Sequence, residues 1–138
     1  MNKSTFSGWI LNASVFRILS QSEQIVRGLV FENITVDVTD GYCGKIFHLH
    51  VRPNSEASYT ESRGYAIEDV TFRNITVRGS VGELYPSVII CRDAEADEKD
   101  GELPHIANVT FDGVTVGDRP IAERDLRVEG NVTNLHLI

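Results

Sequence analysis

Two histidines one residue apart, His48 and His50, are the side chains in this sequence best suited to chemistry at a surface. They lie in the apolar segment 45–51, where strand alternation would send both imidazoles to the face opposite Phe47 and Leu49. Imidazole nitrogens can bond to ligand hydroxyls, and a pair at this spacing can hold a metal when a third ligand joins it. No third ligand is evident in the sequence, so we predict no metal site. A pair that simply faces solvent is the competing interpretation.

Two arginines extend this candidate binding surface. Arg17 alternates with the apolar Ile18 and should point outward, and Arg52 directly follows the segment that carries the histidines. Charged groups on such a face can hydrogen-bond the hydroxyls of a ligand. The candidate binding residues are therefore Arg17, His48, His50 and Arg52. The sequence contains no glycine-rich phosphate loop, and we expect no cofactor.

The strands that would position these groups belong to an internal repeat. The segments that align are 26–36, 67–77 and 106–116. They are spaced by 41 and then 39 residues, and the segment 132–137 repeats the first half of the pattern. Each full unit has a phenylalanine at the same position: Phe31, Phe72 and Phe111. Stacked units would place like over like, so we expect the three rings to form one interior column.

One position in each unit breaks the two-residue alternation of a strand. Val70 and Phe72 share a face, as do Ile75 and Val77, but the step from Phe72 to Ile75 is three residues. The chain must turn there if both apolar pairs are to face inward. The residues at the break are Asn33, Asn74 and Gly113. Because Asn and Gly adopt left-handed backbone angles most readily, we predict a corner at each, with the two asparagine amides hydrogen-bonded along the stack.

Each unit needs one more strand, and the candidates are the segments 15–19, 45–51 and 87–91. A hairpin would require Asn-Gly or Asp-Gly in a two-residue loop, which the break lacks. A helical solenoid would require an apolar period of 3.6 residues, whereas the units show a period of two with one skip. We therefore predict an all-β solenoid of three to four stacked parallel coils, with residues 1–138 forming one domain.

Charge and hydropathy exclude several classes of partner. A formal net charge of −7 weighs against nucleic acid and anionic membrane surfaces, because both require a basic partner. No stretch of about 18 apolar residues occurs, so no membrane-spanning helix is predicted. The first nine residues are polar and contain no apolar signal core.

The repeat resembles a known coil signature. The segments Leu29-Val-Phe-Glu-Asn-Ile-Thr-Val36 and Val70-Thr-Phe-Arg-Asn-Ile-Thr-Val77 are similar to coils of the pectin-lyase-like superfamily. More narrowly, they resemble glycoside hydrolase family 28, the polygalacturonases and their relatives. The resemblance covers residues 10–138 and implies a right-handed parallel β-helix.

A second match lies upstream of the first unit. Family 28 enzymes carry an Arg-Ile-Lys motif on a groove-lining strand, followed by a short loop and a coil signature. Arg17 and Ile18 match this motif at similar spacing, and Leu19 stands where the family has the Lys that contacts the sugar carboxylate. The resemblance implies a pectin-like polysaccharide as partner and implies that Arg17 lines its groove. By strand alternation we expect His48 and His50 on the same face, with Arg52 at its rim.

The catalytic groups of family 28 are an Asn-x-Asp, an Asp-Asp pair and a Gly-His-Gly, and none of these motifs occurs in the 138 residues. Inverting hydrolysis needs two carboxyl groups, about 6.5–9.5 Å apart. We therefore expect the C-terminal part of a longer hydrolase, secreted or periplasmic, and expect this chain alone to be catalytically inert. The alternative is a non-catalytic β-helix module for carbohydrate binding or structure. Without a capping helix in residues 1–14, the first coil would be open to self-association.

Overall fold

Strand-forming side chains dominate the residues that the computed structural model describes, which are 3–5, 14–20, 25–37, 45–51, 65–79, 87–91 and 103–138. Val, Ile and Phe alternate there with polar residues, a pattern that favours strands with one buried face. These residues form the strands β1 to β11, in two sheets, and a short 3₁₀ helix, Glu123–Asp125. The expectation of an all-β chain with parallel strands is confirmed.

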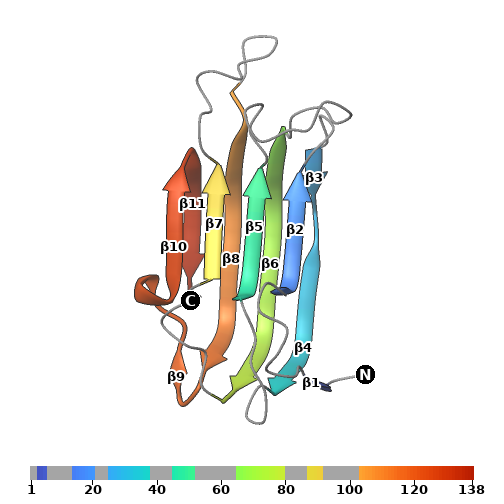
Figure 1. Cartoon of the computed structure of the whole chain (residues 1–138), viewed down its shortest axis with the longest axis vertical. Coiled ribbons are helices and arrows are strands. Elements are labelled where there is room, and N and C mark those ends of the chain that lie inside the picture. The colour runs from blue at the N-terminus through green and yellow to red at the C-terminus, as the bar shows by residue number, and fades with distance from the viewer. Residues whose placement is uncertain are drawn as a thin grey trace.

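Two sheets share these strands. Sheet A contains, in spatial order, β1 (Lys3–Thr5), β4 (Val30–Asp37), β6 (Ala66–Arg78), β8 (His105–Val116) and β11 (Val132–Leu137), with β3 (Ile25–Arg27) also on β6 and β9 (Arg119–Pro120) on β8. Sheet B contains β2 (Ser14–Ser20), β5 (Lys45–Val51), β7 (Ser87–Cys91) and β10 (Leu126–Gly130). All of these pairings are parallel except β8 with β9. The two sheets lie face to face (Figure 1).

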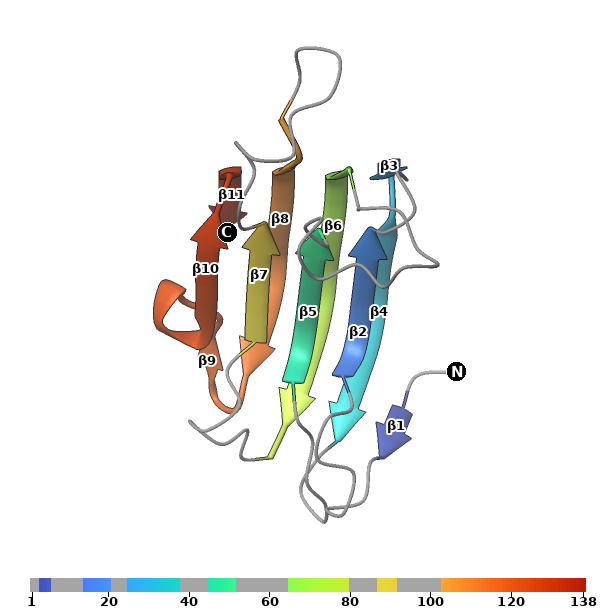
Figure 2. The same ribbon diagram turned by 45° about the horizontal axis from the view of Figure 1, so that its top comes forward.

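The chain passes back and forth between the sheets. From β2 in sheet B it enters β3 and β4 in sheet A, returns to sheet B at β5, and repeats this with β6, β7, β8, β10 and β11. Figure 2 shows the consequence, because the strands of both sheets follow the same order along the stack. Parallel neighbours cannot be joined by a tight hairpin, and here the other sheet supplies each crossover. Three strands of sheet B match the predicted segments, while β10 was not predicted.

The predicted corner residues lie at equivalent places in sheet A. Asn33, Asn74 and Gly113 have φ angles of 59°, 51° and 65°, in the left-handed region. The Asn74 amide nitrogen donates to the Asn33 side-chain oxygen at 2.7 Å. A Cβ added at Gly113 would lie 3.8 Å from the Asn74 backbone nitrogen, an ordinary contact distance. Backbone angle, not lack of space, is therefore what glycine provides at this corner.

A second column of corners, which we did not predict, precedes the first by five residues. Gly28, Asp69, Asn108 and Asn134 all have positive φ, between 54° and 74°. Asn134 donates its amide to the Asn108 oxygen at 3.0 Å, and Asn108 donates to Asp69 at 2.9 Å. The step from the inward Ile67 to the inward Val70 is also three residues, so the same break in alternation signals this corner. The strands β6 and β8, which contain both corners, are therefore each bent twice.

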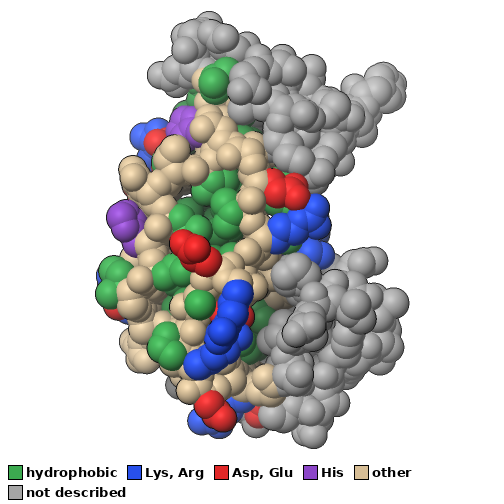
Figure 3. All heavy atoms as spheres, turned by 90° about the vertical axis from the view of Figure 1, so that its left-hand side faces the viewer, with side chains coloured by type: hydrophobic (Ala, Val, Ile, Leu, Met, Phe, Trp, Pro, Cys, Tyr) green, Lys and Arg blue, Asp and Glu red, His purple; other side chains and the backbone are tan. Residues whose placement is uncertain are grey.

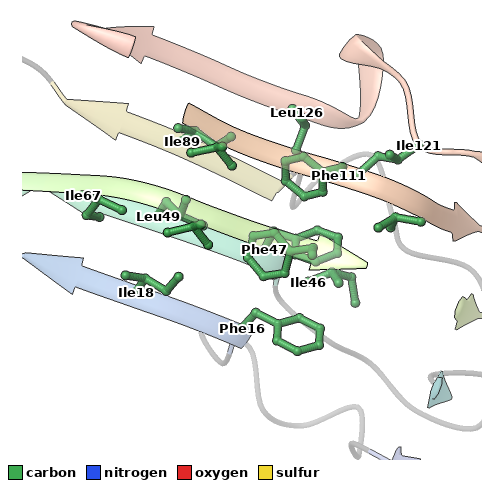
Figure 4. Packing of buried hydrophobic residues seen from close by; sticks show 14 of the residues in the cluster. Phe16, Ile18, Ile46, Phe47, Leu49, Ile67, Ile89, Phe111, Ile121 and Leu126 are labelled. Carbon is green, nitrogen blue, oxygen red and sulfur yellow. The ribbon is translucent and has the colours of Figure 1, made fainter. Parts of the chain in front are cut away.

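Phenylalanines fill the space between the sheets. Phe31 and Phe72 stack with ring centroids 5.4 Å apart, and Phe72 stacks on Phe111 at 5.0 Å, forming the predicted interior column. From sheet B, Phe16 and Phe47 stack at 5.3 Å, and the Phe47 ring meets Phe72 and Phe111 edge-on. Both geometries are favourable for aromatic rings. The close view in Figure 4 shows Phe16, Phe47 and Phe111 directed into the interior together with aliphatic side chains.

A bidentate ion pair shapes the turn that leads into β10. Both guanidinium nitrogens of Arg119 lie 2.6 Å from the carboxylate of Asp125, whose Oδ2 also accepts the backbone N–H of Ala122 at 2.9 Å. The hydrogen bond from Arg119 holds the pKa of Asp125 below its usual value. Charge-assisted bonds of this geometry fix orientation as well as adding stability. They set the direction in which the chain enters sheet B for the last time.

The end of the stack formed by β10 and β11 exposes part of the interior. Figure 3 views this end and shows hydrophobic side chains between borders of backbone and polar groups. Val128 is 44% exposed and Ile138 is 76% exposed. Within the described ranges, no helix combines the length and apolar content that crossing a membrane requires.

Replacing Asn74 tests the corner. Asn74→Ala should lower the free energy of unfolding by about 1–3 kcal/mol, because alanine is strained in the left-handed region and the side-chain hydrogen bond to Asn33 is lost. Asn74→Gly removes only the side-chain hydrogen bond and should lower the free energy of unfolding by about 1 kcal/mol. Urea unfolding of the three proteins measures both differences. Equal losses in the two variants would contradict a backbone role for this residue.

Candidate functional site

The outer face of sheet B carries three of the four predicted binding residues. Arg17 on β2 pairs in register with His48 on β5, and Leu19 pairs with His50. The residues that alternate with them point into the core, so these four side chains lie on the outer side. Arg17 is exposed, and both imidazoles are partly buried. Arg52 lies outside the described residues.

His48 is the most strongly perturbed group on this face. Its Nδ1 lies 3.2 Å from the Ser14 hydroxyl, and its ring stacks on His50 with centroids 5.9 Å apart. Burial, and after it the nearby charges of Lys45, Arg17 and His50, together lower the pKa of His48 to about 4. The imidazole is therefore neutral near pH 7, with one ring nitrogen a donor and the other an acceptor, and its Nδ1 is already engaged by Ser14.

The same face changes character toward β7 and β10. The row that begins with Arg17 continues to Val88 and Arg127, and the next row ends at Ile90 and Glu129. Val88 and Ile90 are buried even though strand alternation turns them away from the core. Arg127 forms an ion pair with Glu129, with 2.6 Å between nitrogen and oxygen. The accessible polar part of the face therefore lies over β2 and β5.

These side chains support binding more than bond cleavage. Over the described strands of sheet B the outer rows hold one carboxylate, Glu129, and it is engaged by Arg127. Inverting hydrolysis needs two carboxyl groups on either side of the bond. Among the described residues, no group of three or more His, Cys, Asp or Glu side chains could hold a metal. Arg17, His48 and His50 instead form a cluster of hydrogen-bonding groups over two adjacent rows.

A second polar surface, which we did not predict, is an open groove of about 600 Å³ on the outer face of sheet A. Its lining combines apolar and polar side chains from several strands: Ile25, Arg27, Tyr65, Glu68, Leu103, His105, Asn131 and Thr133. Glu68 is at its centre, 3.0 Å from the Arg27 guanidinium and 3.5 Å from His105 Nε2. The Tyr65 ring meets His105 edge-on at 6.5 Å.

Part of this groove has a signal in the repeat. Arg27 and Glu68 occupy equivalent positions 41 residues apart, each after an inward apolar residue, so alternation places both on the outer face. The contribution of His105 depends on the pairing of β8 with β6, which sets it opposite Ala66 and diagonal to Glu68. Tyr65 precedes β6 and lies outside the aligned repeat segments. The repeat therefore gives no indication that it lines the groove.

Known proteins give no independent guide to either surface. No family model, curated protein or solved structure matches the chain.

The lowered pKa of His48 predicts a specific pH dependence of stability. Below about pH 6.5 the unfolded chain gains a proton on this residue, whereas the folded protein resists it until about pH 4, so stability falls as the pH drops through that window. For a half-exposed ring the loss by about pH 5 should be on the order of 1 kcal/mol. Denaturant unfolding at about pH 7 and 5 should show a smaller decrease in His48→Gln. A decrease as large as in the unmodified protein would contradict this.

Proposed function

We propose that this chain is a stretch of right-handed parallel β-helix, of three to four coils, from a family 28-like glycoside hydrolase acting on pectin or a related polysaccharide. Its part is to hold sugar units against the outer face of sheet B, while the catalytic carboxylates belong to another part of that hydrolase. The observation that carries the proposal is the pairing of exposed Arg17 with neutral His48 on a parallel sheet whose neighbours are successive repeat units.

The path of the chain supports the β-helix. Each passage through sheet A adds a strand beside its equivalent from the preceding unit, with Phe72 between Phe31 and Phe111. Each passage through sheet B does the same, with Leu49 between Ile18 and Ile89. Corners at the same position of every unit are what a coil of constant cross-section requires.

The charge on the sheet B face supports an acidic sugar. The chain as a whole is negative, with a formal charge of −7. The groups that surround His48 are nevertheless cationic, because Lys45 and Arg17 both contribute to lowering its pKa. A local positive field attracts carboxylates. Arg17 can also bind a uronate with two parallel bonds, and this would compensate for Leu19 at the position where the family has Lys.

A non-catalytic carbohydrate-binding or structural module is the second candidate. It is favoured by the outer rows of the described sheet B strands, where the single carboxylate, Glu129, is paired with Arg127. The two candidates differ in what accompanies the chain. Coding sequence adjoining this segment that contains the Asp-Asp and Gly-His-Gly motifs would support the hydrolase, and adjoining sequence of another kind would support the module.

Binding to pectic oligosaccharides tests the function shared by both candidates. Calorimetric titration with oligogalacturonate should show binding that Arg17→Ala and His48→Ala each weaken roughly tenfold, because each loses a hydrogen bond to the sugar. Arg73→Ala is the matched control, since Arg73 is an exposed arginine on the outer face of sheet A. Absence of binding by the folded protein, or an equal loss in the control, would contradict the proposal.

Hydrolysis is tested separately on the same samples. We expect no new reducing ends when the chain is incubated with polygalacturonate, because the described outer rows of sheet B hold one carboxyl group and the reaction needs two. Steady release of reducing ends by this chain alone would show that the catalytic groups lie within it.

A further inference from the structure

We propose that the groove on the outer face of sheet A binds a neutral oligosaccharide. The groove lies across the molecule from Arg17 and His48, so the inference does not depend on what the sheet B face binds. Its volume of about 600 Å³ falls within the range of small-molecule sites, roughly 300–1,000 Å³. Four strands, β3, β6, β8 and β11, contribute five of its eight lining residues, and Tyr65, Leu103 and Asn131 lie within two residues of those strands.

The arrangement of His105 and Glu68 calls for a hydroxyl. His105 Nδ1 lies 2.9 Å from the backbone oxygen of Leu103, which can only accept a hydrogen bond, so Nδ1 carries a proton. In a neutral imidazole Nε2 is then an acceptor, and it faces a second acceptor, Glu68 Oε2, at 3.5 Å. A ligand hydroxyl that donates a hydrogen bond to either atom would remove the repulsion between the two acceptors. Ligands with several adjacent hydroxyls satisfy it best.

The walls of the groove suit a sugar ring. Ile25 is 46% exposed and, with Tyr65 and Leu103, provides apolar surface for the C–H face of a ring. Asn131 donates its amide to a backbone oxygen at 3.0 Å, which fixes its orientation and retains its oxygen as an acceptor. The exposed Thr133 adds a hydroxyl on the β11 side. Apolar surface with a few placed polar groups is the usual composition of a small-ligand site.

The charges in the groove select a neutral ligand. Glu68 already has a cationic partner, because the Arg27 guanidinium lies 3.0 Å from its carboxylate. An anionic ligand would be repelled by Glu68, and a cationic ligand would be repelled by Arg27. Next to Glu68 in register stands Ala107, followed by Thr133, and the short alanine side chain leaves room above the sheet for an uncharged molecule.

Titration of isotopically labelled protein, followed by NMR, locates the site. Galactotriose serves as the neutral probe and trigalacturonate as the charged one. Galactotriose should shift the amide signals of Glu68, His105 and Thr133, whereas shifts at Arg17 and His48 report on the sheet B face and on the proposed function. No shift at the groove with galactotriose, or tighter binding of trigalacturonate there, would overturn the inference.

Two matched variants then test the chemistry. Glu68→Gln keeps the shape of the side chain but weakens its acceptor, and should reduce galactotriose affinity roughly fivefold to tenfold. Glu32→Gln removes a comparable exposed Arg–Glu pair, 3.5 Å from Arg73, outside the groove, and should leave the affinity unchanged. Both positions lie on the surface, so the variants should fold, as unfolding curves will verify. Equal affinities in the two variants would overturn a role for Glu68.

Discussion

The fold depends on turning the chain with left-handed backbone angles at the same places in every repeat. A strand that continued its alternation through Asn74 would point Ile75 and Val77 at solvent, although both are fully buried. The φ of 51° at Asn74 resets the alternation, so the stretches before and after it both bury their apolar residues. Stacking adds a hydrogen bond from the Asn74 amide to Asn33, which forms only when neighbouring units have the same geometry. Corner and register therefore support each other.

The interior follows from those corners. Once neighbouring units are in register, equal residues face equal residues, and Phe72 stacks between Phe31 and Phe111. The opposite sheet brings Phe47 edge-on to two of these rings. Aromatic packing of this kind buries large apolar areas and defines the spacing between the two sheets. Substituting one ring would disturb at least two repeat units, because no unit has a core of its own.

How much could be predicted from sequence differs between the interior and the surface. The repeat spacing and the break before Ile75 predict parallel strands, the Phe72 column and a corner at Asn74. The corner at Asp69 shows the same three-residue step between inward residues. Its column contains Gly, Asp and Asn, so residue identity does not mark it as clearly. Strand β10 has no counterpart of the apolar runs in β5 and β7, because Arg127, Glu129 and Gly130 occupy most of it. The outer surfaces depend on cross-strand register, which the repeat displays for Arg27 and Glu68 but not for His105.

The separation between inner columns and outer rows explains how one stack can carry two different surfaces. Inward positions are fixed by packing, while outward positions are constrained only by their neighbours on adjacent strands. On sheet B these neighbours place cations around a neutral His48, and on sheet A they place Arg27 against Glu68. Because the described outer side chains of the two sheets lie on opposite sides of the core, substitutions on one face should leave the other face unaffected. Recognition can thus vary face by face while the corners preserve the fold.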